Sequence, residues 1–190
     1  MSNESMPPLI CALSNPDPAT RQNTAKAVFE IGAQLIAPLL REWMSDPDLA
    51  SCIAYAGAPQ ITVGIAVEPQ RFDAIRAASG MPPLADVPPD QDAKEFELAF
   101  PDGVHLDILT TREPGGAGAI ARYLQKLGEG IQQIEVNVNE IDGATELLRT
   151  RFGLTPVYPA TRQGANGTRV NFFLVALPAG GKLLVELVQG

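Results

Sequence analysis

Two acidic residues, Asp107 and Glu186, lie near the centres of two β-rich runs of the chain. A carboxylate held in a strand can take up a proton as a general base, or it can offer oxygen ligands to a cation. Each run is preceded, some forty to fifty residues earlier, by another β-rich run. The four runs are residues 62–67, 105–110, 133–138 and 183–188. This repeated pair of strands predicts one module used twice, with a site that the two copies could share.

His105 is the only histidine of the chain and lies two residues before Asp107. In a strand, the two side chains would therefore point to the same face. The imidazole could ligate a metal ion, although a single histidine on a strand is more often a packed or surface residue. Cys11 and Cys52 are too few for a disulfide framework or a thiolate metal site, and we expect them to pack as small apolar side chains.

The composition predicts a folded domain without affinity for polyanions. The 190 residues, 45% of them hydrophobic, suffice for one domain of ordinary size with a small appendage. A net charge of −8 argues against a nucleic acid or an anionic membrane surface as the main partner. The sequence shows neither a secretory leader nor an apolar run of membrane length, so we expect a cytoplasmic location.

Residues 1–56 are predicted to form a helical segment. Asp17 can cap a first helix, Gly32 is expected to end it, and Pro38 is expected to kink or begin a second helix. A Ser-Asn/Asp-Pro-Asp motif recurs after 31 residues. The segment resembles a HEAT-type helical repeat, and a single repeat of that type has to dock on another surface.

From about residue 60 the hydrophobic period changes from that of helices to that of strands. Two βαβββ modules are expected, at about residues 60–112 and 131–190, joined by a helix at residues 117–127. The expected strands are residues 61–67, 96–100, 104–109, 132–138, 154–159, 170–177 and 182–188, and the expected helices are residues 70–79 and 142–151. The proline-rich residues 81–92 are predicted to form a loop that could lie over a cavity.

One glycine-rich stretch imitates a dinucleotide-binding turn. Gly116 and Gly118 follow a predicted strand, and acidic residues come about twenty residues later. However, residues 110–115 separate the glycines from the strand, whereas the fingerprint needs a tight turn between strand and helix. The stretch is therefore interpreted as the entry to the linking helix.

Residues 57–190, taken as one domain, resemble the vicinal-oxygen-chelate superfamily of glyoxalases, bleomycin-resistance proteins and extradiol dioxygenases. Within that superfamily the chain is most similar to the methylmalonyl-CoA epimerases. The segments that carry the resemblance are residues 65–67, 120–124, 128–134, 152–154 and 184–189. The resemblance implies an α+β fold in which the two modules form a cup-shaped sheet around one divalent metal ion.

The resemblance also implies a set of metal ligands, namely Thr62, Asp107, Gln133 and Glu186. The epimerase pattern has histidine at the first and third of these positions, so this chain keeps both carboxylate positions and lacks both imidazoles. Oxygen ligands suit Mg²⁺, Mn²⁺ or Ca²⁺ better than Co²⁺ or Zn²⁺. The expected cofactor is a divalent metal ion (Mg²⁺, Mn²⁺ or Co²⁺), with a shifted ligand set that uses His105 and a metal-free protein as the alternatives.

The function implied by the resemblance is that of an isomerase or lyase. Such an enzyme stabilises the enolate of a small thioester or α-keto substrate. The catalytic base is not identified, although Asp90 occupies about the right region. One alternative is a metal-free cup that sequesters a small ligand, lined by Phe96, Phe172 and Tyr158. Another is a partner-binding protein that uses the helical segment, and the resemblance alone suggests a homodimer.

Overall fold

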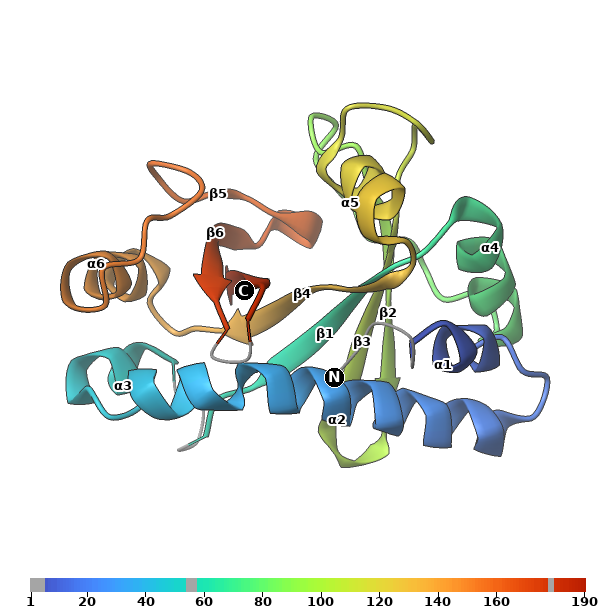
Figure 1. Cartoon of the computed structure of the whole chain (residues 1–190), viewed down its shortest axis with the longest axis horizontal. Coiled ribbons are helices and arrows are strands. Elements are labelled where there is room, and N and C mark those ends of the chain that lie inside the picture. Colours follow the sequence, from blue (N-terminus) through green and yellow to red (C-terminus); the bar gives the residue numbers. More distant parts are fainter. Residues whose placement is uncertain (1–5, 54–57, 178–179) are drawn as a thin grey trace. The chain divides into compact units, whose positions relative to one another are not determined.

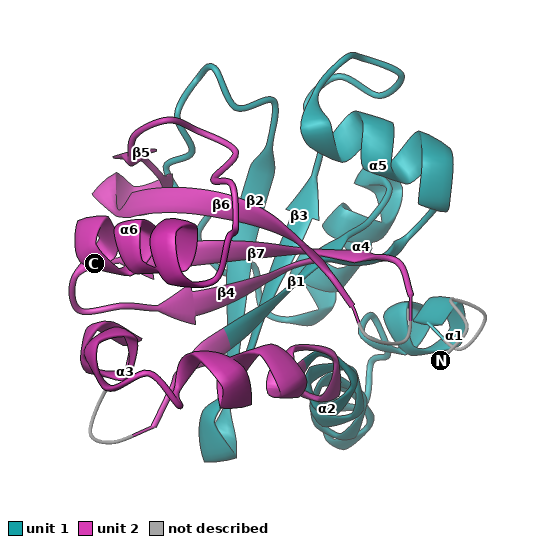
Figure 2. Ribbon diagram, turned by 60° about the vertical axis from the view of Figure 1, so that its left-hand side comes forward, with its two compact units in different colours: residues 1–32, 62–132 teal, residues 33–61, 133–190 magenta. Residues whose placement is uncertain are grey.

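The computed structural model describes residues 6–53, 58–177 and 180–190. The chain forms two compact units, each made of two stretches of sequence (Figure 2). Unit 1 comprises residues 1–32 and 62–132, and unit 2 comprises residues 33–61 and 133–190. Each unit combines helices with strands, which confirms the α+β class. The predicted domain boundary at residues 56 and 57 lies outside the described residues, and it stays a prediction.

The N-terminal segment is helical, as predicted, but its helices differ from those expected (Figure 1). They are α1 (Met6–Ala12), α2 (Pro18–Trp43) and α3 (Pro47–Ile53). Asp17 accepts backbone N–H bonds at the start of α2, as a cap should. The predicted break at Gly32 was wrong, because α2 continues through Gly32 and Pro38. Val28 and Ile36, one helical turn on either side of Gly32, are fully buried, and such packing outweighs the cost of about 1 kcal/mol of a helical glycine. The HEAT-like character of the segment stays a prediction.

Unit 1 contains a three-stranded part of the sheet and two helices besides its part of the N-terminal segment. The elements are β1 (Ile61–Ala66, from Thr62 on), α4 (Pro69–Ala78), β2 (Lys94–Phe100), β3 (Val104–Thr110) and α5 (Ala119–Leu127). The strand order is β2-β3-β1, with β1 parallel and β2 antiparallel to β3. The hairpin turn predicted between β2 and β3 is confirmed, with Asp102 and Gly103 at positive φ. Between residues 58 and 112, all of them described, the module is βαββ, one strand short of the predicted βαβββ.

Unit 2 contains a four-stranded part of the sheet and α6. Its elements are β4 (Gly130–Asn137, from Gln133 on), α6 (Ile141–Arg151), β5 (Arg162–Gln163), β6 (Arg169–Ala176) and β7 (Lys182–Gln189). The strand order is β4-β7-β6-β5, and only β4 and β7 are parallel. The predicted strand at residues 154–159 was wrong. Pro156 and Pro159 cannot donate to a sheet, so the stretch makes only an isolated bridge from Pro156 to Phe173.

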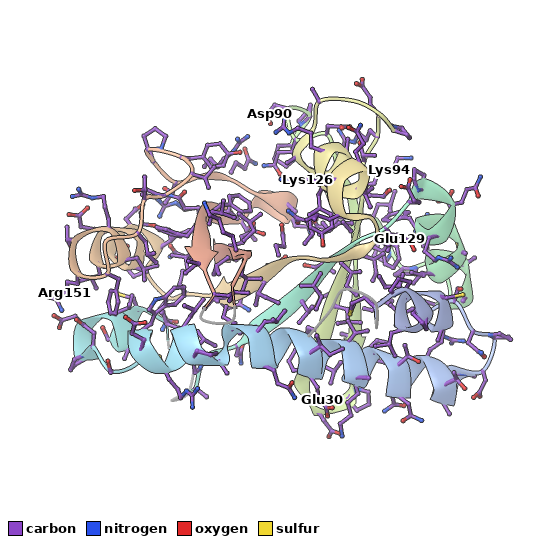
Figure 3. All side chains as sticks on the ribbon, viewed as in Figure 1. Glu30, Asp90, Lys94, Lys126, Glu129 and Arg151 are labelled. Carbon is purple, nitrogen blue, oxygen red and sulfur yellow. The ribbon has the colours of Figure 1, made fainter. Side chains whose placement is uncertain are left out.

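The helix α3 is fastened to α6 within unit 2. Arg151, labelled in Figure 3, donates hydrogen bonds of 2.7 Å to Asp46 and to Asp48. The backbone N–H of Asn139 donates to the carbonyl of Cys52 at 2.6 Å. The end of the N-terminal segment is therefore an integral part of this unit. In the described ranges, no helix has the length and apolar character that crossing a membrane requires.

Candidate functional site

Strands β2 and β3 place three carboxylates and one imidazole on one face of unit 1. Glu97 lies directly opposite Asp107 in the antiparallel pair. Side chains alternate along a strand, so Glu95 shares the face of Glu97, and His105 shares the face of Asp107. Asp107 is buried, with 6% of its surface exposed. This face, defined by Glu95, Glu97, His105 and Asp107, is called the acidic face.

Thr62 belongs to the same face. Strand β1 runs parallel to β3, and the register sets Gly64 beside Asp107. Thr62 lies two residues before Gly64, so its side chain points to the same side, and it is 8% exposed. Unit 1 thus brings two of the predicted ligand residues, Thr62 and Asp107, onto one face of neighbouring strands.

Glu95 is a strongly perturbed titratable group of this face. Burial, followed by the negative charges of Asp107 and Glu97, raises the pKa of Glu95 from 4.5 to about 7. A carboxylate with such a pKa is poised to take up or release a proton at neutral pH. Glu95 is absent from the site that the sequence predicts. The sequence pattern could have indicated this residue. Acidic and apolar residues alternate from Glu95 to Leu98, which places two carboxylates on one side of a strand.

His105 is engaged by its neighbour on β2. Its Nδ1 lies 2.5 Å from the Oε1 of Glu97, and the side chains are 41% and 53% exposed. The pair is therefore a surface interaction at the rim of the acidic face. A ligand role for His105 stays a prediction.

Phe96 and Asp90 lie elsewhere in unit 1. Phe96 is fully buried, and its ring packs edge-to-face on Phe72 of α4 with centroids 4.8 Å apart. It points to the opposite side of β2 from Glu95. Asp90 is exposed on the loop of residues 81–92 (Figure 3). The structure does not bring either residue onto the acidic face.

The other two predicted ligand residues form a hydrogen-bonded pair in unit 2. Gln133 on β4 and Glu186 on β7 are each 7% exposed. The amide Nε2 of Gln133 donates to the Oε2 of Glu186 at 2.5 Å and to the Oε1 of Glu135 at 3.2 Å. The β4–β7 register sets Glu135 beside Glu186, so one amide serves two neighbouring carboxylates.

These four side chains suit a hard ion such as Mg²⁺ or Mn²⁺ better than they suit Co²⁺ or Zn²⁺. Thr62, Asp107, Gln133 and Glu186 include neither imidazole nor thiolate, the ligands that Co²⁺ and Zn²⁺ favour. Gln133 turns its amide nitrogen, which is a hydrogen-bond donor and not a metal ligand, toward Glu186. Within the described part of the chain, no group of three or more His, Cys, Asp or Glu residues is placed to hold a metal ion.

Two of the predicted ligand-lining aromatic residues meet in unit 2. The rings of Tyr158 and Phe172 pack edge-to-face with centroids 5.9 Å apart. The guanidinium carbon of Arg162 lies 4.6 Å above the centre of the Tyr158 ring. Phe172 is directly opposite Glu186 in the β6–β7 pair, so the aromatic pair lies on the face that carries Gln133 and Glu186.

Comparison with known proteins agrees with the fold that the resemblance implied. No protein-family model matches the chain, and no curated protein sequence is similar to it. Among solved structures, the methylmalonyl-CoA epimerase of Mycobacterium tuberculosis is 29% identical, with a TM-score of 0.57, over 73% of this chain and 89% of that one. A variant of the Streptomyces coelicolor methylmalonyl-CoA epimerase, solved with 2-nitronate-propionyl-CoA, is 26% identical, with a TM-score of 0.54, over 68% and 92% of the two chains.

A hypothetical protein of Bacillus halodurans, 22% identical with a TM-score of 0.56 over 70% of this chain and 95% of that one, shares the fold. The predicted α+β fold is therefore confirmed: this chain has the fold of methylmalonyl-CoA epimerase and the glyoxalases.

Proposed function

We propose that this protein is an epimerase-like member of the glyoxalase group that moves a proton at the carbon beside the carbonyl of a small acyl thioester. The observation that carries the proposal is Glu95, whose pKa of about 7 suits a general base at neutral pH. The substrate class is supported by the names of the similar structures, which are methylmalonyl-CoA epimerases.

In the proposed reaction, the carboxylate of Glu95 takes the α-proton. The C–H bond breaks, and its electron pair moves into the enolate. The planar enolate then turns its opposite face toward Glu95, and protonated Glu95 returns a proton to carbon on that face, which inverts the centre. The charges of Asp107 and Glu97 oppose an ionised Glu95 and so strengthen it as a base.

A developing enolate needs a hydrogen-bond donor, because negative charge accumulates on the carbonyl oxygen. We assign this role to the hydroxyl of Thr62, which lies on the acidic face with Asp107. The reaction as proposed needs no metal ion. Ligation of Mg²⁺, Mn²⁺ or Co²⁺ by the four predicted residues is a separate proposal.

Exchange of the α-proton of methylmalonyl-CoA for deuterium in D₂O tests the function. The wild type is compared with Glu95→Gln and with Glu30→Gln, which makes the same change of charge at an exposed position of α2 (Figure 3). We expect exchange with the wild type and with Glu30→Gln, and a rate lower by a factor of about 10² or more with Glu95→Gln. Each protein is assayed once with a chelator present and then separately with Mg²⁺, Mn²⁺ or Co²⁺ added. Absence of exchange at high protein concentration under all conditions would refute the function.

A second candidate function is sequestration of a small ligand without turnover. The aromatic pair Tyr158 and Phe172, with Arg162 over one ring, favours it, since such side chains hold planar or apolar groups well. The two functions predict different results in one assay. A sequestering protein binds the thioester and releases it with its α-proton intact, whereas an epimerase exchanges the proton. The predicted homodimer is tested by sedimentation.

A further inference from the structure

The loop of residues 81–92, here called the strap, lies along the outer strand of unit 1. In the order β2-β3-β1, β2 has a strand neighbour in unit 1 on one side only. On its other side, the backbone N–H of Ala85 donates to the carbonyl of Glu95 at 2.9 Å. Val87, two residues further along the strap, is buried, with 4% of its surface exposed. The strap therefore covers the edge of β2 at Glu95.

The end of the strap is fastened by one carboxylate. Asp92 accepts a hydrogen bond of 2.6 Å from the hydroxyl of Thr111. It also accepts backbone N–H bonds from Arg112 at 3.0 Å and from Glu113 at 3.1 Å. The three donors belong to the segment that follows β3, so Asp92 ties the strap to the strand that carries Asp107. We call this cluster of three hydrogen bonds the latch.

Two arginines support the strap along its length. Arg76 of α4 donates to the carbonyl of Pro82 at 2.8 Å, and Arg112 donates to the carbonyl of Val87 at 3.3 Å. These bonds go to backbone carbonyls, so they hold the path of the strap whatever its side chains are. The latch is the one attachment among these that depends on a side chain of the strap itself.

Gly118 leaves the space that the latch occupies. A Cβ atom at this position would lie 2.3 Å from the Oδ2 of Asp92 and 3.0 Å from its Cγ. The backbone of Gly118, with φ −62° and ψ 159°, is a conformation that alanine adopts readily. Alanine at this position would therefore push the carboxylate away without straining its own backbone.

We propose that Asp92 is a positioning residue, which latches the strap over the edge of β2 and thereby limits the hydration of Glu95. The consequence for catalysis rests on the proposed function, but the latch itself does not. Burial is the first cause of the raised pKa of Glu95, and the charges of Asp107 on β3 and Glu97 on β2 come after it. His105, which pairs with Glu97, completes the acidic face. An open strap would hydrate Glu95 and make it a weaker base.

Amide hydrogen exchange tests the latch without any turnover. The variant is Asp92→Ala, and the matched control is Asp73→Ala, at an exposed position of α4 with the same loss of charge. We expect the amide of Ala85 to exchange roughly tenfold faster or more in Asp92→Ala, because three hydrogen bonds to a charged group are lost. Asp73→Ala should exchange as the wild type does. In Asp92→Ala, Glu95 should also titrate at a lower pH, as followed by ¹³C NMR of its carboxyl carbon.

Gly118→Ala provides a second way to open the latch, which also serves if Asp92→Ala fails to fold. Gly118→Ala should increase the hydrogen-exchange rate of the Ala85 amide by a similar factor. The double variant should exchange no faster than either single variant, because both changes remove the same contact. Unchanged exchange at Ala85 in both folded single variants would overturn the latch, and so would effects that add in the double variant. If Ala85 responds while the wild type shows no α-proton exchange, the latch stands and the proposed function fails.

Discussion

Replacement of Glu95 by glutamine should make the protein more stable at alkaline pH. The pKa of Glu95 is about 7 in the folded protein, against an ordinary value of 4.5. Below pH 4.5 the carboxyl is protonated in both the folded and the unfolded chain, so it does not lower the free energy of unfolding. As the pH rises from 4.5 to 7, the unfolded chain releases the proton and the folded chain keeps it, so stability falls with rising pH. Above pH 7 the free energy of unfolding is lowered by the full amount.

The magnitude follows from the difference between the two pKa values. A difference of about 2.5 corresponds to about 3 kcal/mol at pH 8, and to less than about 1 kcal/mol at pH 5. Glutamine has nearly the same shape and carries no charge, so Glu95→Gln should unfold at higher urea concentration than the wild type at pH 8. The two proteins should be nearly equal at pH 5.

Urea denaturation followed by circular dichroism at pH 5 and pH 8 measures the difference. Glu30→Gln removes the same negative charge at an exposed position. Its stability relative to the wild type should not increase between pH 5 and pH 8. If the stabilities of the wild type and of Glu95→Gln fell in parallel between pH 5 and pH 8, then Glu95 would titrate alike in the folded and unfolded chains. Glu95 would then lack the raised pKa on which its role as a base depends.

Three further changes test other parts of the structure. Gln133→Ala removes the donor of the 2.5 Å bond to buried Glu186, and it should cost about 1.5–3 kcal/mol in urea denaturation. Phe96→Ala, which empties a fully buried position against Phe72, should cost about 3–5 kcal/mol in the same assay and leave wild-type affinity for the thioester in the fraction that folds. Deletion of residues 1–53 should abolish cooperative unfolding, because α3 is fastened to α6. If the truncated chain were stable and unfolded cooperatively, residues 1–53 would instead be a separate segment available to bind a partner.

Some strands alternate apolar with polar residues, and others are apolar throughout. Both kinds could be predicted from the sequence, because the pattern of residues reflects burial directly. The β2–β3 hairpin was also predictable, since Asp102 and Gly103 adopt the positive φ that such a turn needs. Local rules failed at Gly32, where the buried positions around it keep the helix intact. They failed again at residues 154–159, where apolar residues suggested a strand and two prolines prevent one.

The candidate site was only partly predictable for a physical reason. Asp107 and Glu186 stand out as acids within β-rich runs, and the resemblance supplied the complete set with Thr62 and Gln133. The raised pKa of Glu95 depends on Asp107 from the next strand and on burial, neither of which one strand alone reveals. The bond from Gln133 to Glu186 likewise joins residues far apart in sequence, and it changes what the pair offers to a ligand.

The pH dependence of deuterium exchange into methylmalonyl-CoA tests the proposed function most directly. If Glu95 is the base, the exchange rate of the wild type rises with pH and levels off above a midpoint of about 7, and Glu95→Gln shows no such rise. A midpoint near 4.5, or a Glu95→Gln protein as active as the wild type, would contradict the assignment of Glu95 as the base.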